Sequence, residues 1–166
     1  MPRLRFDPIA EARRQWEDHG WEDEATPMAV VTSIMRVQQI LLARTDGVLR
    51  PLDLTFARYE LLMLLSFSRQ GALPLGKIGE RLQVRAASVT SAVDRLERDG
   101  LVARAPNPAD GRGTLARLTP AGRQRAAEAT TLLNEEVFAD LGVEPEALAS
   151  LFDLLTVVRR EAGDFA

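Results

Sequence analysis

The fold is decided by residues 75–119, LGKIGERLQVRAASVTSAVDRLERDGLVARAPNPADGRGTLARLT, in which two helical patterns precede two strand patterns. Apolar residues recur every three or four positions in residues 75–82 and again in 89–96, the spacing that lines one face of a helix. Residues 83–85 leave room only for a short turn, so the stretch predicts a helix-turn-helix. The apolar positions on its expected buried face are Leu75, Ile78, Leu82, Val89, Val93 and Leu96.

After Gly100 the pattern changes from helical to that of short strands. Leu101–Ala105 and Thr114–Leu118 have strand character, and Pro106–Gly113 between them is rich in turn-forming residues. We therefore expect a β-hairpin after the second helix. Two helices followed by a hairpin is the order of a winged helix-turn-helix.

The outer side of the second helix has the chemistry that a DNA major groove requires. A helix that enters this groove, about 12 Å wide, must present small or hydrogen-bonding side chains. Arg112 lies between two glycines in the hairpin loop, where a long cation suits a narrow, negative minor groove. The predicted DNA-contacting residues are Arg85, Ala86, Ser88, Thr90, Ser91, Arg95 and Arg112.

Plainer roles stay open for several of these residues. Arg95 has Asp99 four positions later on the same helix, so the two can form an ion pair. Ser88 and Ser91 also fit an exposed polar face, and Arg112 also fits a solvated loop arginine.

The distribution of charge indicates a localised phosphate-binding surface, although the total charge does not. The 166-residue chain has a formal net charge of −3. Residues 75–125 nevertheless contain ten Lys or Arg residues and five acidic ones, a net charge of +5. A basic block in an acidic protein is typical of nucleic-acid binding, but a solvated charged face has the same composition.

The residues before this block predict further helices. We expect a short amphipathic helix over Pro8–His19, a break at Glu22–Pro27 and a long helix over Met28–Leu49. The long helix has two apolar stripes, and so wide an apolar face needs partners on two sides. Thr55 is placed to cap the next helix, and Gly71–Pro74 predicts a turn after it.

The residues after the hairpin predict two more helices. Thr119 and Pro120 provide a side-chain cap and a first-turn proline for one helix, which Gly142 ends, and the last begins near Pro145. The simplest way to bury the apolar faces of the terminal helices is against each other and against a second copy. A monomeric helical core is the alternative. The residues expected to be buried on the last helix are Leu148, Leu151, Phe152, Leu155 and Val158.

The composition argues against several classes of protein. The chain has no cysteine, which excludes disulfides, thiolate metal sites and thiol-based oxidant sensing. His19 is the only histidine, and the sequence has no glycine-rich phosphate loop and no zinc motif. We therefore expect that the protein is not an enzyme and that it binds no metal and no cofactor. The longest apolar run, Leu61–Leu65, is too short for a bilayer, and the N-terminus lacks a signal-peptide pattern. We therefore expect a cytoplasmic protein with no membrane contact.

Several of these motifs resemble the MarR family of bacterial regulators. The similar stretches are residues 54–62, 75–84, 89–102, 110–112 and 118–122. The most specific parts are the Asp-x-Arg of the hairpin and the Leu-Thr-Pro-x-Gly that follows it. The flanking helices match in order and length, so the resemblance extends over nearly the whole chain.

The resemblance implies one domain over residues 1–166, mainly α with a small β-hairpin wing. Residues 1–50 and 120–166 would form dimerisation helices, and residues 51–119 the winged helix-turn-helix lobe. A homodimer with two such lobes would bind a pseudo-palindromic operator in double-stranded DNA and act as a ligand-responsive repressor. The alternative is a winged-helix module that binds protein and not DNA.

The resemblance also assigns roles to single residues. It implies that Arg112 reaches the minor groove and that Asp110 and Arg95 brace the wing through an ion pair. The chain departs from the family at the start of the second helix, where Arg85 and Ala86 lie near the usual serine or threonine cap. We therefore expect Arg85 to contact phosphate.

An added N-terminal helix with a tryptophan resembles the urate-responsive branch of the family. In that branch a tryptophan, an acidic residue of the second core helix and arginines surround the ligand, and Trp16 and Glu60 fit the first two roles. The arginine expected near the recognition helix aligns with Ala92, so urate itself is not expected. Alternatively, Trp16 only anchors the extra helix. The residues predicted to line a crevice for another small organic effector are Trp16, Arg36, Arg58, Tyr59 and Glu60.

Overall fold

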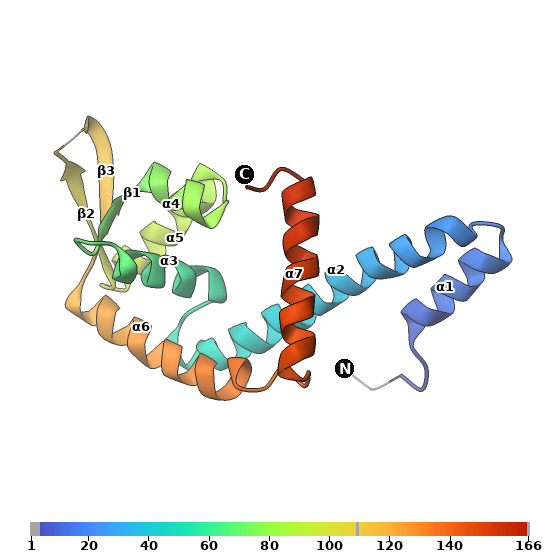
Figure 1. Ribbon diagram of the computed structural model, residues 1–166. Helices are drawn as coiled ribbons and strands as arrows, with labels where there is room; N and C mark the ends of the chain where they lie inside the picture. The colour runs from blue at the N-terminus through green and yellow to red at the C-terminus, as the bar shows by residue number, and fades with distance from the viewer. Residues whose placement is uncertain (1–3, 109, 166) are drawn as a thin grey trace.

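The structure is a computed structural model that describes residues 4–108 and 110–165, apart from the side chains of residues 110–112 (Figure 1). It is mainly helical with one small antiparallel sheet, which confirms the predicted fold class. The elements in chain order are α1 (Pro8–Asp18), α2 (Glu22–Leu49), the 3-10 turn η1 (Arg50–Leu52), α3 (Phe56–Phe67), β1 (Ala72–Pro74), α4 (Leu75–Leu82), α5 (Ala86–Arg98), β2 (Val102–Asn107), β3 (Asp110–Leu118), α6 (Pro120–Leu133), the π-helical turn η2 (Asn134–Phe138) and α7 (Pro145–Glu161).

The lobe at residues 51–119 is organised around the apolar residues that the helical patterns predict. Ile78 of α4 and Val89, Val93 and Leu96 of α5 are buried in one core with leucines of α3. Burial of this stripe orients α5, because side chains three or four residues apart share one face of a helix and the others point away. The packing of α5 therefore decides which of its residues face solvent.

Two hydrogen bonds fix the start of α3 against the end of α2. The Thr55 hydroxyl accepts one from the Arg58 amide at 3.4 Å, as its predicted capping role requires. The Asp46 carboxylate of α2 accepts another from the Phe56 amide at 2.7 Å. First-turn amides have no partner within their own helix, so these two acceptors set the direction in which α3 leaves α2.

The sheet is larger than the predicted hairpin. Its strand order is β1-β3-β2, and β1 pairs with β3 within Gly71–Pro74, where a turn alone was expected. The two hairpin strands also extend into the predicted loop Pro106–Gly113, with a register shift after Pro106. A proline ends a strand only where its missing N–H is needed, and β2 is an edge strand that tolerates it.

Helix α2 begins at Glu22, so the predicted break at Glu22–Pro27 is wrong. Glu22, Asp23 and Glu24 form its first turn, where negative side chains interact favourably with the positive end of the helix dipole. Ala25 is fully buried, and Pro27 is the sixth residue of the helix, where its missing N–H removes one helical hydrogen bond. Acidic residues thus favour a first helical turn as well as a loop, and a proline just beyond that turn does not end this helix.

The terminal helices are arranged around α2. Helix α1 folds back along the first part of α2, and the joint carries an edge-to-face contact between Trp16 and Trp21 with ring centres 5.4 Å apart (Figure 1). At the other end, Arg44 of α2 donates hydrogen bonds to the carbonyl oxygens of Asp140, at 3.1 Å, and of Glu136. These bonds satisfy carbonyl groups at the end of the α6–η2 helix and tie it to α2.

Helix α7 stands beside the rest of the chain with its apolar residues largely exposed (Figure 1). None of its residues is buried, so the expected burial of Leu148, Leu151, Phe152, Leu155 and Val158 does not occur within one chain. Within the described ranges, no helix is both long and apolar enough to cross a bilayer.

Candidate nucleic-acid interface

The six predicted DNA-contacting residues whose side chains are described are all exposed. Arg85 precedes α5. Ser88, Ser91 and Arg95 lie on the side of α5 away from the buried valine stripe, whereas Ala86 and Thr90 lie beside that stripe, where α5 faces α4. The helix is thus anchored by its apolar face and presents methyl, hydroxyl and guanidinium groups outward. These six residues are Arg85, Ala86, Ser88, Thr90, Ser91 and Arg95.

The N-terminus of α5 has no side-chain cap. Arg85 occupies the capping position with an extended backbone, and its carbonyl accepts hydrogen bonds from Ser88 N at 2.9 Å and Val89 N at 3.2 Å. The amides of Ala86 and Ala87 begin the helix beside two small side chains. Such an open helix end with an arginine next to it attracts an anion, because the helix dipole and the guanidinium are both positive.

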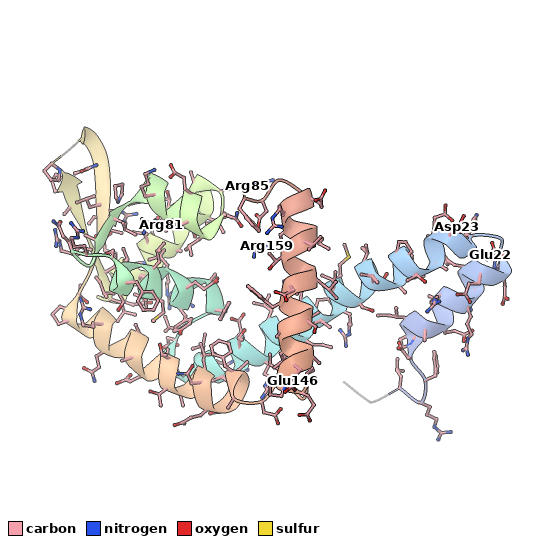
Figure 2. All side chains as sticks on the ribbon, in the orientation of Figure 1. Glu22, Asp23, Arg81, Arg85, Glu146 and Arg159 are labelled. Carbon is pink, nitrogen blue, oxygen red and sulfur yellow. The ribbon has the colours of Figure 1, made fainter. Side chains whose placement is uncertain are left out.

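The turn before α5 is connected to the C-terminal end of the chain. Gln83 adopts a left-handed conformation with φ of 55°, and its side-chain amide donates a hydrogen bond to the Asp164 carbonyl at 3.0 Å. Figure 2 labels Arg85 and Arg159 on the two sides of this junction. The start of α5 is therefore joined to the segment that follows α7.

Arg95 forms an ion pair within its own helix, which was one of the alternatives that the sequence allowed. Its Nε lies 3.2 Å from Asp99 Oδ2, and Arg58 Nη1 of α3 approaches the same oxygen at 3.8 Å. The brace between Arg95 and Asp110 that the family resemblance implies involves an Asp110 side chain outside the described part. The same holds for Arg112, whose main chain lies in β3, so its predicted contact with DNA stays a prediction.

Arg104 of β2 connects the wing to α5, a contact that sequence reasoning missed. Its Nη2 lies 2.6 Å from Asp94 Oδ1, and its Nη1 lies 2.5 Å from Glu97 Oε2. These hydrogen bonds, above all the one to Asp94, raise the pKa of Arg104 above its ordinary value. The only sequence signal was a pair of acids one turn apart on α5 and an arginine just after Gly100.

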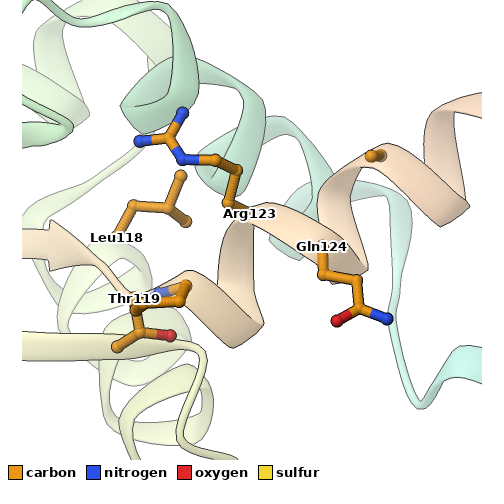
Figure 3. A pocket seen from close by; sticks show the side chains of 6 residues that line it. Leu118, Thr119, Arg123 and Gln124 are labelled. Carbon is orange, nitrogen blue, oxygen red and sulfur yellow. The ribbon is translucent and has the colours of Figure 1, made fainter.

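A shallow hollow of about 650 Å³ separates the start of α3 from the outer face of α5. Arg58, Arg95 and Arg98 line it together with Ser88 and Ser91, so predicted DNA-contacting residues form one of its walls. A second hollow, of about 450 Å³, lies at the start of α6, where the Arg123 side chain extends over Leu118 (Figure 3). None of the predicted site residues lines this second hollow.

The structure does not bring the five predicted effector residues together within one chain. Trp16 contacts Trp21 just before α2, whereas α3 is joined to Asp46 in the last turn of α2. At 1.5 Å per residue these two places are about 38 Å apart. A crevice that joined Trp16 to Glu60 would therefore need a second copy of the chain.

Tyr59 and Glu60 differ in their surroundings although they are neighbours on α3. Tyr59 is a core residue whose hydroxyl is hydrogen-bonded to Thr130 of α6 at 3.1 Å, which does not support a place on a pocket wall. Glu60 is exposed, and partial desolvation raises the pKa of its carboxyl. Arg58 points toward the hollow beside α5, and Arg36 lies on α2 with Gln39 as one partner, at 3.3 Å.

Comparison with known proteins agrees with this geometry. The family model described as "MarR family" matches residues 54–114. The crystal structure of Sco5413, a MarR family transcriptional regulator from Streptomyces coelicolor, is 51% identical, with 84% of this chain and 97% of that chain covered and a TM-score of 0.78. That of Sco3205, a MarR family transcriptional regulator from the same organism in complex with DNA, is 26% identical, with 80% and 84% covered and a TM-score of 0.70.

A curated relative gives a shorter match. The HTH-type transcriptional repressor IacR of Pseudomonas putida is 32% identical over 99 residues. This match covers 58% of this chain and 58% of the relative's own length.

Proposed function

The chain belongs to the MarR family of transcriptional regulators, and from this premise we propose that it acts as a homodimeric repressor on a pseudo-palindromic operator and is released by a small organic effector. The observation that carries the proposal is the outer face of α5. A buried valine stripe holds the helix in place, and its open N-terminus and exposed polar residues point outward. This arrangement suits a helix that is inserted into the major groove.

The contacts divide into two kinds. Arg85 and the first amides of α5 are placed for phosphate, which positions the lobe but carries no sequence information. Ser88, Ser91 and Arg95 are placed for base edges. The similar regulator solved with DNA favours this function over a winged helix that binds only protein.

A second copy of the chain is the proposed partner of the terminal helices. Apolar side chains are exposed along α2 and α7, far more than a stable monomer leaves in contact with water. Burial of these faces in a two-fold dimer would place two α5 helices about one DNA turn apart.

The deciding experiment is a gel shift with genomic fragments from beside the protein's own gene, followed by salt titration of the bound fragment. We expect a dimer to bind one fragment specifically, with affinity that falls steeply as salt rises. A chain that is monomeric at micromolar concentration and shifts no duplex would contradict the proposal.

Two arginine variants test the assigned contacts. Arg112→Ala is expected to weaken operator binding by about 1–3 kcal/mol, whereas Arg85→Ala weakens all duplexes and lowers the salt slope by about 1. Arg14→Ala on α1 is the matched control, because it removes an exposed arginine outside the lobe. Melting curves accompany all three variants, and a large loss of stability in Arg112→Ala would make that residue structural.

Effector binding is the finer part of the proposal. A ligand that releases DNA must bind the DNA-incompetent arrangement more tightly. In a crevice between two copies, Trp16→Phe would keep the dimer and its DNA affinity but reduce release by small aromatic carboxylates. Release that equals that of the wild type would leave Trp16 as the anchor of α1, in keeping with its contact with Trp21.

A further inference from the structure

Three contacts join the first strand of the wing to α5, and together they form what we call the Arg104 bridge. The guanidinium of Arg104 pairs with Asp94 at 2.6 Å and with Glu97 at 2.5 Å. The main-chain N–H of Arg104 donates a hydrogen bond to the other oxygen of Glu97 at 3.1 Å. Because both side chain and backbone take part, the bridge fixes the position of β2 as well as that of one side chain.

The position of the bridge in the sheet makes it a link between the two elements that meet DNA. In the order β1-β3-β2, strand β2 lies at the edge of the described sheet and pairs with β3, and Arg104 lies opposite Ala116 in that pairing. Glu97 therefore binds a main-chain group on the edge of β2 that faces α5. Strand β3, which carries Arg112, is held to α5 through β2.

The bridge also changes the charge that α5 presents. Asp94 and Glu97 lie on the same helix as Arg95 and Arg98, and an uncompensated carboxylate there would repel phosphate. Arg104 places one guanidinium between the two acids. It therefore neutralises part of the negative charge without adding a side chain to the outer face of α5.

The exposure of the partners indicates that the bridge serves geometry more than stability. The side chain of Arg104 is 28% exposed to solvent, and those of Asp94 and Glu97 are 52% and 39% exposed. Ion pairs this exposed contribute little to the free energy of unfolding. A variant that loses the guanidinium is thus expected to remain folded.

We propose that Arg104 is a positioning residue for DNA binding, which holds the wing at a fixed angle to α5 and masks Asp94 and Glu97, so that helix and wing engage the operator as one unit. The inference rests on the proposed function. It concerns how sequence specificity is achieved. The measured quantity is therefore the affinity for the operator divided by the affinity for a scrambled duplex of the same length.

The test compares Arg104→Met with Arg117→Met in fluorescence anisotropy titrations against both duplexes. Methionine keeps the apolar stem of the arginine and removes its charge. Arg117 is the matched control because it lies next to Ala116 on β3, on the opposite face of the sheet, and donates to the Gln70 carbonyl at 3.5 Å. We expect Arg104→Met to lower the affinity ratio about tenfold, equivalent to about 1.4 kcal/mol, and Arg117→Met to leave it unchanged.

Additional substitutions separate positioning from direct phosphate contact. When Asp94→Asn and Glu97→Gln are added to Arg104→Met, part of the lost operator affinity should return, because the unmasked charges are gone. The salt dependence of DNA binding by this triple variant should have the same slope as that of the wild type. Equal losses on both duplexes, a salt slope lower by about 1 and no recovery would make Arg104 a phosphate contact and overturn the inference.

The remaining outcomes distinguish failure of the proposed function from failure of this inference. Wild-type protein that binds no duplex overturns the proposed function and this inference with it. Wild-type binding with an unchanged affinity ratio in Arg104→Met overturns the inference alone. Should Arg104→Met fail to fold, Glu97→Ala removes two of the three contacts of the bridge and must by itself lower the affinity ratio.

Discussion

The winged lobe and the terminal helices differ in how much of their structure one chain completes. In the described part of the lobe at residues 51–119, Phe67 and Val84 are the large apolar residues that stay exposed. Helix α2 instead exposes apolar residues between positions 30 and 42, and α7 exposes them between positions 151 and 158. The exposed ones include Val30, Val31, Ile34, Met35, Val37, Ile40, Leu42, Leu151, Phe152, Leu154, Val157 and Val158.

The difference shows that the two regions depend on different partners. The lobe buries its apolar stripes against its own strands and helices, against Leu49 of α2 and against the buried face of α6, so its shape follows from contacts within one chain. Helices α2 and α7 have the same kind of apolar stripe, but most of it is left uncovered by the described part of the chain. Their arrangement relative to the lobe is therefore tied to the proposed dimer, and the two regions should respond differently to the same kind of substitution.

The largest difference between the two regions is expected when one exposed phenylalanine in each is replaced by a charged residue. Phe152 of α7 is 66% exposed and Phe67 of the lobe is 78% exposed. We expect Phe152→Glu to cost at least about 2 kcal/mol of dimer stability, as for an aromatic residue central to an interface, and Phe67→Glu to cost nothing. Sedimentation equilibrium measures both, and dissociation by Phe67→Glu alone would place the interface on the lobe.

A methyl group added where α6 packs against the lobe should have the next largest effect. A Cβ on Gly122 would overlap the Leu101 carbonyl oxygen, a main-chain atom that cannot move alone. We expect Gly122→Ala to destabilise the protein by about 1–3 kcal/mol or more in urea unfolding. Gly47→Ala on α2 is the control, because no described atom lies within 4 Å of the added Cβ and alanine favours a helix by about 0.5–1 kcal/mol. Equal effects of the two would contradict the close approach at Gly122.

A smaller effect is expected from loss of the cap of α6, which joins the lobe to the terminal helices. Thr119 Oγ1 accepts a hydrogen bond from Gly122 N at 2.9 Å and donates to the Gly100 carbonyl at 2.8 Å. Thr119→Ala should cost about 1 kcal/mol, visible as a lower Tm. Thr131→Ala, which loses only a bond to Ala127 O within the same helix, should have little effect. A lower Tm for Thr131→Ala than for Thr119→Ala would argue against the cap.

The smallest expected effect is a pH-dependent change in stability that arises from a side chain of α3, in the lobe. Desolvation raises the pKa of Glu60, so the folded state disfavours its charged form. This penalty is absent below the unfolded pKa of about 4.3 and grows as pH rises through the folded pKa. Glu60→Gln should therefore raise Tm relative to the wild type at pH 7 but not at pH 4. A gain of equal size at both values would exclude the titration of Glu60 as its cause.

Local patterns predicted the lobe well and its edges poorly. Helices α4 and α5 were predictable because an apolar residue every three or four positions has one low-energy solution, with that face buried. Pro106 misled the strand prediction, since a proline stops a central strand but not the outer edge of β2. Glu22–Pro27 misled the helix prediction, because acidic residues favour a first helical turn as well as a loop and because α2 continues through Pro27.

For the predicted site, exposure could be foreseen only where the residues are close in sequence. The exposed face of α5 follows from its buried face, so Ser88, Ser91 and Arg95 could be chosen without a structure. Arg104 could not, because its pairing with Asp94 depends on the path of the chain back over α5 after Gly100. Likewise, nothing local indicates that Trp16 and Tyr59 lie at opposite ends of α2.

By itself, the sequence determined the order of helices and wing, the buried stripe of α5 and the cap at Thr119, because periodicity and capping are settled within a few neighbouring residues. The tertiary structure decided that β1 joins the sheet, that Arg104 bridges wing and helix, and that α1 lies far from α3. The physical reason is that these contacts join segments whose relative positions depend on the packing of the whole chain. The apolar faces of α2 and α7 extend this dependence to the proposed second copy.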